Sequence, residues 1–310
     1  MIEDLFAAPV IIGILTSGMR LATPYLFAGL GETFSQRSGV LNLGVEGQML
    51  VGAYAGFFVA LVTENPWLGL ATAALVGALM GLAMAFVSVN LQAQQGISGI
   101  GFFLFGLGIS ELLFQKMVGT VETVSGFRPV HIPVLSELPV VGEVLFQHNV
   151  LVYTAFLLVP ISWFVLNKTN IGLNVRAVGE NPHAADSLGV SVERTRYVTV
   201  TMGGLLSGIA GASLSIALLN VFQQNLTNGI GFIAVALVYF GGWRPFGLLA
   251  GALLFSLVNS LQVWVQTLGI PIASEFAVMM PYVLTIVVLA LAGQRVRAPS
   301  ALTVPFERGG

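Results

Sequence analysis

The chain has 310 residues, of which 56% are hydrophobic and only 8% are charged. Because soluble domains carry about a quarter charged residues, this composition excludes the ordinary soluble classes. The net charge of −2 argues against a nucleic-acid-binding surface, and the absence of cysteine excludes disulfides and thiolate metal sites. The sequence starts Met-Ile-Glu-Asp, which is acidic and unlike a cleavable signal peptide, so we expect the first apolar stretch to stay in the mature protein.

Long stretches without Asp, Glu, Lys or Arg indicate membrane-spanning segments. Charged residues are absent from 65–110, 197–243 and 245–274, and one helical passage needs about 20 residues. Polar and turn-forming residues divide the apolar sequence, so we expect an all-α, polytopic transmembrane helical bundle of about nine passages, forming one domain over 1–310. The predicted passages are 6–30, 45–63, 67–90, 97–117, 149–167, 197–219, 230–242, 247–267 and 277–293.

The passage at 230–242 is short for a full crossing at 1.5 Å per residue. It is either tilted or part of a broken helix of the kind that transporters use. The tetrapeptide Gly-Ile-Gly-Phe occurs at 99–102 and again at 229–232, at the start of passages predicted to run in opposite directions. This recurrence marks either an inverted repeat or a coincidence in a chain rich in glycine and phenylalanine.

Small residues recur at close spacing within the passages, as at Gly203, Gly204, Ser207, Gly208 and Gly211. Such spacing lets helix backbones approach each other closely in a membrane. We therefore expect tight helix packing along the passage 197–219, without requiring a transport role of any single glycine.

Lysine and arginine gather in two segments outside the predicted passages. Because cytoplasmic loops hold the excess of these residues, both segments are expected in the cytoplasm. An even number of passages separates them, and counting backwards places the N-terminus and the loop 119–148 outside. The basic residues are Lys168, Arg176, Arg194 and Arg196 in the loop 168–196, and Arg295, Arg297 and Arg308 in the tail.

The loop 168–196 encodes a short helix of its own. Asn181 is a good N-cap, Pro182 suits the first helical position, and Gly189 supplies a left-handed stop. Ser191 can then cap the next helix. A rigid, independently capped helix between two passages is what a partner protein needs in order to push on the membrane domain. The alternative is an ordinary loop helix that rests on lipid or on neighbouring loops.

Polar side chains at membrane depth are costly and usually face a cavity or another helix. Asn259, Gln262 and Gln266 fall on one side of the predicted passage 247–267. Because amides hydrogen-bond both base edges and sugar hydroxyls, this stripe is the strongest candidate for a hydrophilic substrate pathway. Interhelical amide bonds within the bundle are the alternative.

Three further residues are candidates for that pathway. Asn42 and Glu46 are four residues apart, which predicts one shared helical face near the cytoplasmic interface. They either line the pathway or brace a helix end together with Arg37. Phe102 either stacks on a base or packs against lipid and neighbouring helices, in a chain that has 21 phenylalanines.

Enzymatic and ion-coupled classes fit the sequence less well. His131, His148 and His183 lie in predicted loops, no His-Glu-x-x-His motif occurs, and we expect neither a catalytic residue nor a metal or cofactor site. The chain lacks a Gly-x-x-x-x-Gly-Lys-[Ser/Thr] phosphate loop, so ATP hydrolysis would need another polypeptide. An ion-coupled secondary transporter stays open as the alternative class, although it would typically bury titratable residues at the midplane. A channel or scaffold would leave the capped loop helix unexplained.

Three separated segments resemble one family of permeases. The run 174–185, Asn-Val-Arg-Ala-Val-Gly-Glu-Asn-Pro-His-Ala-Ala, is similar to the ATPase-docking loop of the permeases of ribose-type sugar, branched-chain amino-acid and nucleoside ABC importers. The segment 31–47, preceded by Ala-Thr-Pro, is similar to the segment before that family's second passage. The stretch 231–247 resembles the nucleoside branch, which is linked to basic membrane proteins, although simple-sugar members share much of it. Gln36 departs from the pattern, since many relatives have an acidic residue there.

The resemblance implies a permease subunit of an ABC importer of nucleosides or a related small polar solute, with a simple-sugar permease as the alternative. The partners that it implies are a fused double ATPase using ATP and Mg, a second homologous permease and an extracytoplasmic solute-binding protein, besides membrane lipid. It also implies a bacterial inner-membrane location. On this resemblance the ATPase-docking surface comprises Arg176, Asn181, Pro182, His183, Ala184, Ala185, Asp186 and Leu188.

Overall fold

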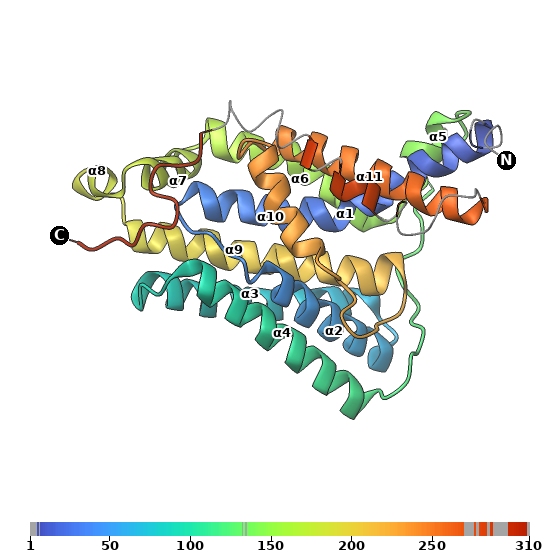
Figure 1. The fold of residues 1–310 in the computed structure, drawn as a ribbon, viewed down its shortest axis with the longest axis horizontal. Coiled ribbons are helices and arrows are strands. Elements are labelled where there is room, and N and C mark those ends of the chain that lie inside the picture. Colours follow the sequence, from blue (N-terminus) through green and yellow to red (C-terminus); the bar gives the residue numbers. More distant parts are fainter. Residues whose placement is uncertain are drawn as a thin grey trace.

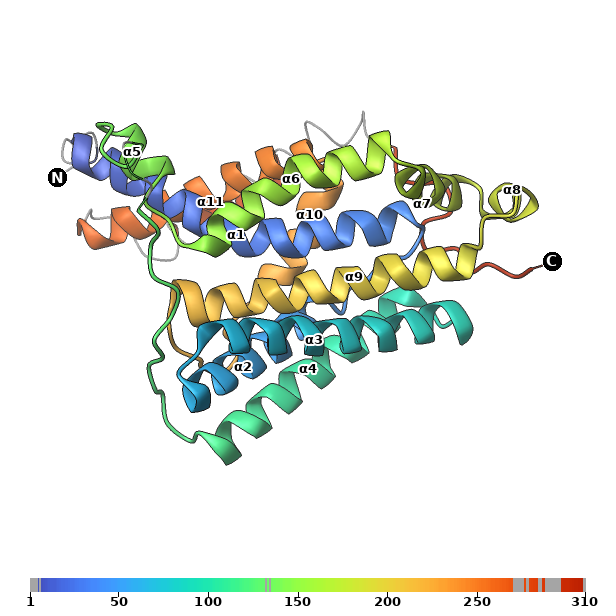
Figure 2. The same ribbon diagram turned by 180° about the vertical axis from the view of Figure 1, so that it is seen from behind.

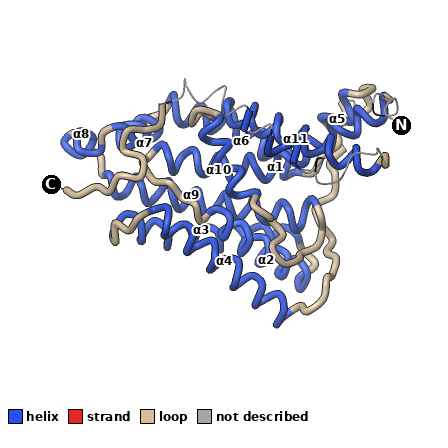
Figure 3. Tube along the Cα trace, viewed as in Figure 1, coloured by secondary structure: helices blue, strands red, loops and turns tan. Residues whose placement is uncertain are grey.

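The computed structural model of the chain describes residues 5, 7–131, 133, 135–269, 276, 279–283, 286–287 and 297–308. Helices make up most of this part of the chain, and no strand occurs in it (Figure 3). Two isolated bridges, Thr123 with Val221 and Pro129 with Asn149, tie loops together at one end of the bundle. The predicted all-α class is confirmed.

Seven of the described helices are long and apolar enough to cross a membrane, so the protein is a multi-pass membrane protein. Each overlaps one predicted passage. They are α1 (Ala8–Arg37), α2 (Val45–Thr63), α3 (Pro66–Ala85, extended by a π-helical turn Phe86–Asn90), α4 (Gln95–Met117), α6 (Val150–Lys168), α9 (Val192–Ser213, extended by a π-helical turn Leu214–Leu218) and α11 (Pro245–Thr267). The ninth predicted passage, 277–293, lies largely outside the described residues.

The first helix is longer than predicted, because α1 continues to Arg37 rather than ending near residue 30. Its last turns are polar in sequence but buried. The carboxyl oxygen Oε1 of Glu32 accepts hydrogen bonds from the Gln36 side chain at 3.0 Å and from the backbone N–H of Asn42 at 2.9 Å. The segment 38–44 therefore runs back along the end of α1 before α2 begins. A buried polar group is tolerated when it is hydrogen-bonded, which is why polarity alone misplaced this boundary.

The close helix packing expected along the passage 197–219 is found where α9 meets α3. A Cβ atom built on Gly204 would lie 2.4 Å from the carbonyl oxygen of Gly77, and one on Gly208 would lie 2.1 Å from that of Ala73. Any side chain at these positions would force the two backbones apart. This contact joins α9 to α3 in one layer, with α2 and α4 beside them (Figures 1 and 2).

The short apolar helix α10 (Ile230–Phe240) runs across the long helices rather than alongside them (Figure 1). It packs against α1, α2 and α11. It thus links the layer of α2, α3, α4 and α9 to the layer of α1, α6 and α11. The expectation of a tilted or broken element at 230–242 is consistent with this arrangement, whereas the inverted repeat suggested by the two Gly-Ile-Gly-Phe sequences stays a prediction.

The two ends of the bundle carry different elements (Figure 2). The start of α1 and the short helix α5 (Val141–Leu145) lie at one end. Helices α7 (Asn170–Glu180) and α8 (Pro182–Ser187) lie at the other, where the described tail joins them through the N–H of Ala301, which donates to the carbonyl of Gly179 at 2.8 Å. The basic loop and the basic tail therefore share one end of the molecule.

Candidate transport pathway and docking helix

A cavity of about 320 Å³ lies between α1, α11 and the segment that leads into α10. Its described lining carries amide, hydroxyl and aromatic groups but no charged side chain. Tyr25 is close to the middle of α1, and Asn259 lies well inside α11, so the cavity sits within the depth of the membrane-spanning helices. The lining residues are Tyr25, Leu226, Thr227, Asn228, Ile230, Ile233, Phe255, Asn259, Gln262, Pro281 and Tyr282.

Two members of the predicted amide stripe reach this cavity. Asn259 and Gln262 line it, and both are half-buried. Gln266, one turn further along α11, is exposed and does not line it. The helical spacing therefore placed the stripe on one face, but only its inner two amides meet the hollow.

Aromatic rings form a chain across the same wall. The ring centroids of Tyr25 and Phe255 are 5.3 Å apart with an interplanar angle of 71°, and those of Phe255 and Tyr282 are 6.3 Å apart at 80°. Phe102 is not among these rings. It lies on α4 in an apolar groove against α3 and packs against a cluster that includes Val40 and Met84, so the structure does not bring it to the amides.

Glu46 holds the beginning of α10. It is 1% exposed, and its carboxyl oxygens accept hydrogen bonds from the Thr227 hydroxyl at 2.5 Å, the Gly229 N–H at 2.7 Å and the Gly231 N–H at 2.6 Å. The first N–H groups of a helix have no partner within it, and Glu46 supplies one. Thr227 also lines the cavity, so this carboxyl group fixes part of the cavity wall.

Asn42 and Glu46 do not share a helical face as predicted. Asn42 precedes α2, lies in the returning segment 38–44, and its amide donates to Gln48 at 3.1 Å. Arg37 braces neither of them, because its Nε donates to the backbone carbonyl of Trp243 at 3.0 Å. The i to i+4 spacing indicates a shared face only if the helix already includes both residues, and α2 starts between them at Val45.

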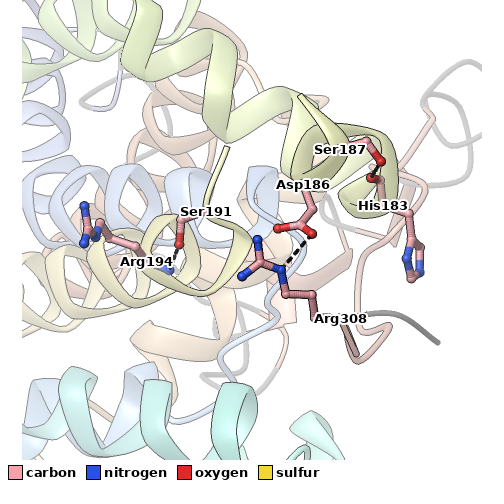
Figure 4. A network of polar contacts seen from close by, with 6 residues as sticks. All are labelled: His183, Asp186, Ser187, Ser191, Arg194 and Arg308. Carbon is pink, nitrogen blue, oxygen red and sulfur yellow. Dashed lines mark hydrogen bonds and ion pairs between the residues drawn. The ribbon is translucent and has the colours of Figure 1, made fainter. Parts of the chain in front are cut away.

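The short capped helix predicted in the loop 168–196 is present as α8. The Asn181 side chain accepts from the Ala184 N–H at 3.0 Å, and Gly189 has a φ of +85°. The Ser191 hydroxyl accepts from the Arg194 N–H at 3.3 Å, as Figure 4 shows. Helix α7, which was not predicted, fills the first half of the loop, and its N-cap is Thr169. Thr169 could have predicted the start of α7, because threonine is a preferred N-cap residue.

Helix α8 is anchored on one side and open on the other. Ala185 packs in a small apolar cluster with Val178, Val192 and Phe306, and Phe306 belongs to the C-terminal tail. Arg308 and Asp186 point toward each other, with Nε 3.2 Å from Oδ2 (Figure 4). Leu188 is 85% exposed at the end of α8. The C-terminal tail therefore packs against α8, while the Leu188 side chain at the end of this helix is exposed.

The remaining residues of the predicted docking set differ in exposure. His183 and Ala184 are exposed, whereas Pro182 is buried. The His183 ring lies beside the Phe306 ring with centroids 5.1 Å apart. Arg176 lies apart from α8, on α7, where it lines a separate cavity with Arg37 and Arg244.

Comparison with known proteins decides the family. A family model described as the branched-chain amino acid transport system / permease component matches residues 14–289. The chain belongs to this permease family. It is the permease component of an ABC importer and not an enzyme, which removes the ion-coupled secondary transporter as an alternative. No solved structure matches the permease.

Several curated relatives are similar to this permease over nearly its whole length. The putative glucose ABC transporter permease TsgC13 of Haloferax volcanii is 40% identical, covering 96% of this chain and 98% of its own. The guanosine ABC transporter permease NupQ of Bacillus subtilis is 35% identical, covering 96% and 97%. The nucleoside ABC transporter permease NupC of Lactococcus lactis is 37% identical, covering 93% and 94%.

Proposed function

We propose that this permease forms part of the membrane pathway for nucleosides in an ABC importer. The observation that carries the proposal is the cavity at Tyr25, Asn259, Gln262 and Tyr282, which combines amides with aromatic rings and presents no charge within the described residues. A neutral solute with a flat base and hydroxyl groups suits that combination.

Each half of a nucleoside has a counterpart in the cavity wall. Side-chain amides donate and accept, so Asn259 and Gln262 can bind base edges or ribose hydroxyls. The rings of Tyr25, Phe255 and Tyr282 can stack on the base, and such stacking contributes about 1–3 kcal/mol per base. The relatives NupQ and NupC, whose names specify guanosine and nucleosides, support this assignment.

A simple sugar is the second candidate cargo, because the Haloferax relative is named as a putative glucose permease. Amides bind sugar hydroxyls as readily as ribose hydroxyls. The aromatic chain on the cavity wall favours the nucleoside, since a base offers a π-face to it.

The importer would be completed by other chains. An ATPase subunit that binds ATP and Mg would dock on α8, and a fused double ATPase is the form we propose. NupP of Bacillus subtilis and TsgB13 of Haloferax volcanii are more distant permease relatives, 28% and 26% identical, from organisms that also have a closer relative. We therefore propose a second, homologous permease as the membrane partner, and an extracytoplasmic binding protein that delivers the solute.

In this proposal the end with α8 faces the cytoplasm of a bacterial inner membrane. The basic residues support that orientation, because Lys168, Arg176, Arg194 and Arg308 all lie at this end and cytoplasmic ends hold the excess of Lys and Arg. The N-terminus and the loop 119–148 then lie outside.

Substrate uptake by the reconstituted importer tests the cargo. We expect ATP-driven uptake of labelled guanosine that unlabelled nucleosides inhibit and glucose does not. Asn259→Ala should reduce the initial rate about tenfold, which corresponds to about 1.4 kcal/mol, one or two lost hydrogen bonds. Gln266→Ala is the matched control on the same helix and should leave the rate unchanged. Equal inhibition by glucose would favour the sugar permease, and an unaffected Asn259→Ala would remove the cavity from the pathway.

A further inference from the structure

A second cavity, of about 730 Å³, lies at the end of the bundle that carries α7 and α8. Three arginines from separate parts of the chain line it: Arg37 at the end of α1, Arg176 on α7 and Arg244 directly before α11. Helices far apart in the sequence thus bring three positive charges to one hollow. Neither the nucleoside pathway nor the docking helix α8 uses them.

The three positive charges have no ion-pair partner within the described residues. Arg37 donates Nε to the carbonyl of Trp243 and Arg176 donates Nε to the carbonyl of Gly172 at 3.4 Å, and within the described chain none of the three arginines forms an ion pair. The positive charges of Arg176 and Arg244 both repel the positive charge of Arg37. The carboxylate of Glu180 opposes this repulsion and has the largest effect on Arg37 of the three charges, but it accepts hydrogen bonds from the hydroxyl and N–H of Ser300 at 3.1 and 3.4 Å and forms no ion pair with any of the three arginines.

The first turn of α11 adds to the positive potential. This 23-residue helix begins at Pro245 in the cavity wall, and no side chain caps its first N–H groups. Free N–H groups and the dipole of a long helix favour an anion at that point. Three arginines and an uncapped helix start therefore surround one space. Arginine side chains can bind an anionic group there through paired N–H donors.

The rim of the cavity is suited to hydrocarbon. Trp163 on α6 is 38% exposed and Phe246 on α11 is 47% exposed, with ring centroids 6.1 Å apart. The ammonium group of Lys168 lies 5.9 Å from the Trp163 ring centroid. Trp and Lys at the end of a membrane-spanning helix mark the headgroup level of a bilayer. The hollow thus joins a cationic floor to an apolar, aromatic edge at the depth where phospholipid headgroups lie.

We propose that this cavity binds the headgroup of an anionic phospholipid, with Arg37, Arg176 and Arg244 around its phosphate and Trp163 and Phe246 against its glycerol and upper acyl chains. A free phosphate ion shares the charge chemistry but has no use for the aromatic rim. Basic pockets between membrane helices bind anionic headgroups elsewhere by the same physics. The site is independent of the cargo, so it stands or falls separately from the proposed transport function.

Native mass spectrometry of the full-length chain in detergent tests the proposal. On titration with phosphatidylglycerol, a saturating one-lipid adduct should form at lower concentration than with phosphatidylcholine. The double variant Arg176→Gln/Arg244→Gln should weaken phosphatidylglycerol binding about tenfold or more, because two of the three arginines around the phosphate lose their charge. Arg194→Gln/Arg297→Gln removes the same charge from exposed positions of the same end, outside the cavity, and should bind like the unaltered chain.

Two further measurements distinguish loss of charge from loss of folding, and a lipid from a free phosphate ion. Arg176→Lys/Arg244→Lys retains the charge and should retain most of the preference, which separates lost charge from lost folding if the glutamine variant is unstable. Inorganic phosphate at the same concentrations should not displace the lipid. The proposal is overturned by equal affinity for the two lipids, by equal losses in the two glutamine variants, or by displacement with inorganic phosphate.

Discussion

At the residue scale, the carboxyl group of Glu46 connects the parts of the molecule that matter most for transport. It joins the start of α2 to the start of α10 and to Thr227 in the cavity wall. Its three hydrogen-bond donors, Thr227, Gly229 and Gly231, lie 181, 183 and 185 residues further along the chain. Glu46, which the sequence indicated as a pathway candidate, thus binds a residue of the cavity wall and does not itself line the cavity.

We predict that Glu46→Ala destabilises the permease by about 3 kcal/mol, because three buried donors lose their acceptor. Glu46→Gln should be less harmful, since one amide oxygen remains. Thermal unfolding in detergent, followed by intrinsic fluorescence, would show a melting temperature lowered by several degrees for alanine and by less for glutamine. Glu111→Ala is the matched control: this carboxyl group lies on α4 and has one long contact, 3.5 Å to Gln115. Equal melting temperatures for both alanine variants would contradict the capping role.

His148, in the loop after α5, makes the stability of the protein depend on pH. It is 1% exposed, and its Nε2 lies 2.7 Å from the carbonyl of Val144. Burial lowers the pKa of its imidazole, the hydrogen bond to Val144 opposes this shift in part, and the charge of Arg20 adds to it. The folded protein then binds fewer protons than the unfolded chain. The stabilising contribution is complete above the unfolded pKa of about 6.5 and is lost as the pH falls through the lowered folded pKa.

We therefore expect the melting temperature to fall as the buffer is acidified from about pH 7.5 to pH 5, and His148→Gln to reduce that fall. Glutamine can still donate to the Val144 carbonyl but does not titrate. His131→Gln, in the same loop but exposed, is the control. An unchanged pH profile in His148→Gln would show that this buried imidazole does not contribute to acid sensitivity.

At the element scale, α8 illustrates what capping residues can predict. Asn181, Pro182, Gly189 and Ser191 define its limits from sequence because each cap is local. Its anchoring by Phe306 depends on a contact with the tail more than 100 residues away, which no local pattern encodes. The same limit applies to α1, whose polar last turns read as a loop because the partner of Gln36, the indole of Trp243, is 207 residues distant.

The docking of α8 can be tested directly because the chain contains no cysteine. We predict that His183→Cys forms a cross-link with the ATPase subunit of the reconstituted importer. Glu137→Cys, exposed in the loop 119–148, should form none, since that loop lies at the other end of the bundle. Cross-linking absent in every nucleotide state would exclude α8 as the docking element.

The tail should control the yield of that cross-link. Adding Phe306→Ala removes the ring that packs under Ala185, so α8 should lose its orientation and the yield should fall severalfold. Adding Arg308→Gln removes only an exposed ion pair, whose arginine side chain is 79% exposed, and should change the yield little. Equal yields from the two variants would mean that the apolar anchor does not position α8.

At the scale of the whole molecule, apolar stretches bounded by polar and turn-forming residues predicted the seven described helices that are long enough to span a membrane, because charged side chains are costly in lipid. The cavity was only half predictable. The stripe of Asn259 and Gln262 follows from helical periodicity, whereas Tyr25 and Asn228 reach the same hollow through the packing of α1 and of the segment before α10. Long-range packing is also what gathers Arg37, Arg176 and Arg244 at one end.

The most direct test of the account is solvent access to the cavity in the working importer. In a chain without native cysteine, Asn259→Cys can be labelled with a water-soluble maleimide in proteoliposomes, with Gln266→Cys as the control on the same helix. We predict that Asn259→Cys is labelled, that ATP changes the labelling rate, and that guanosine but not glucose protects it, while labelling of Gln266→Cys responds to neither nucleoside nor glucose. An Asn259→Cys that is inaccessible in every state, or that no nucleoside protects, would contradict the assignment of this cavity as the nucleoside pathway.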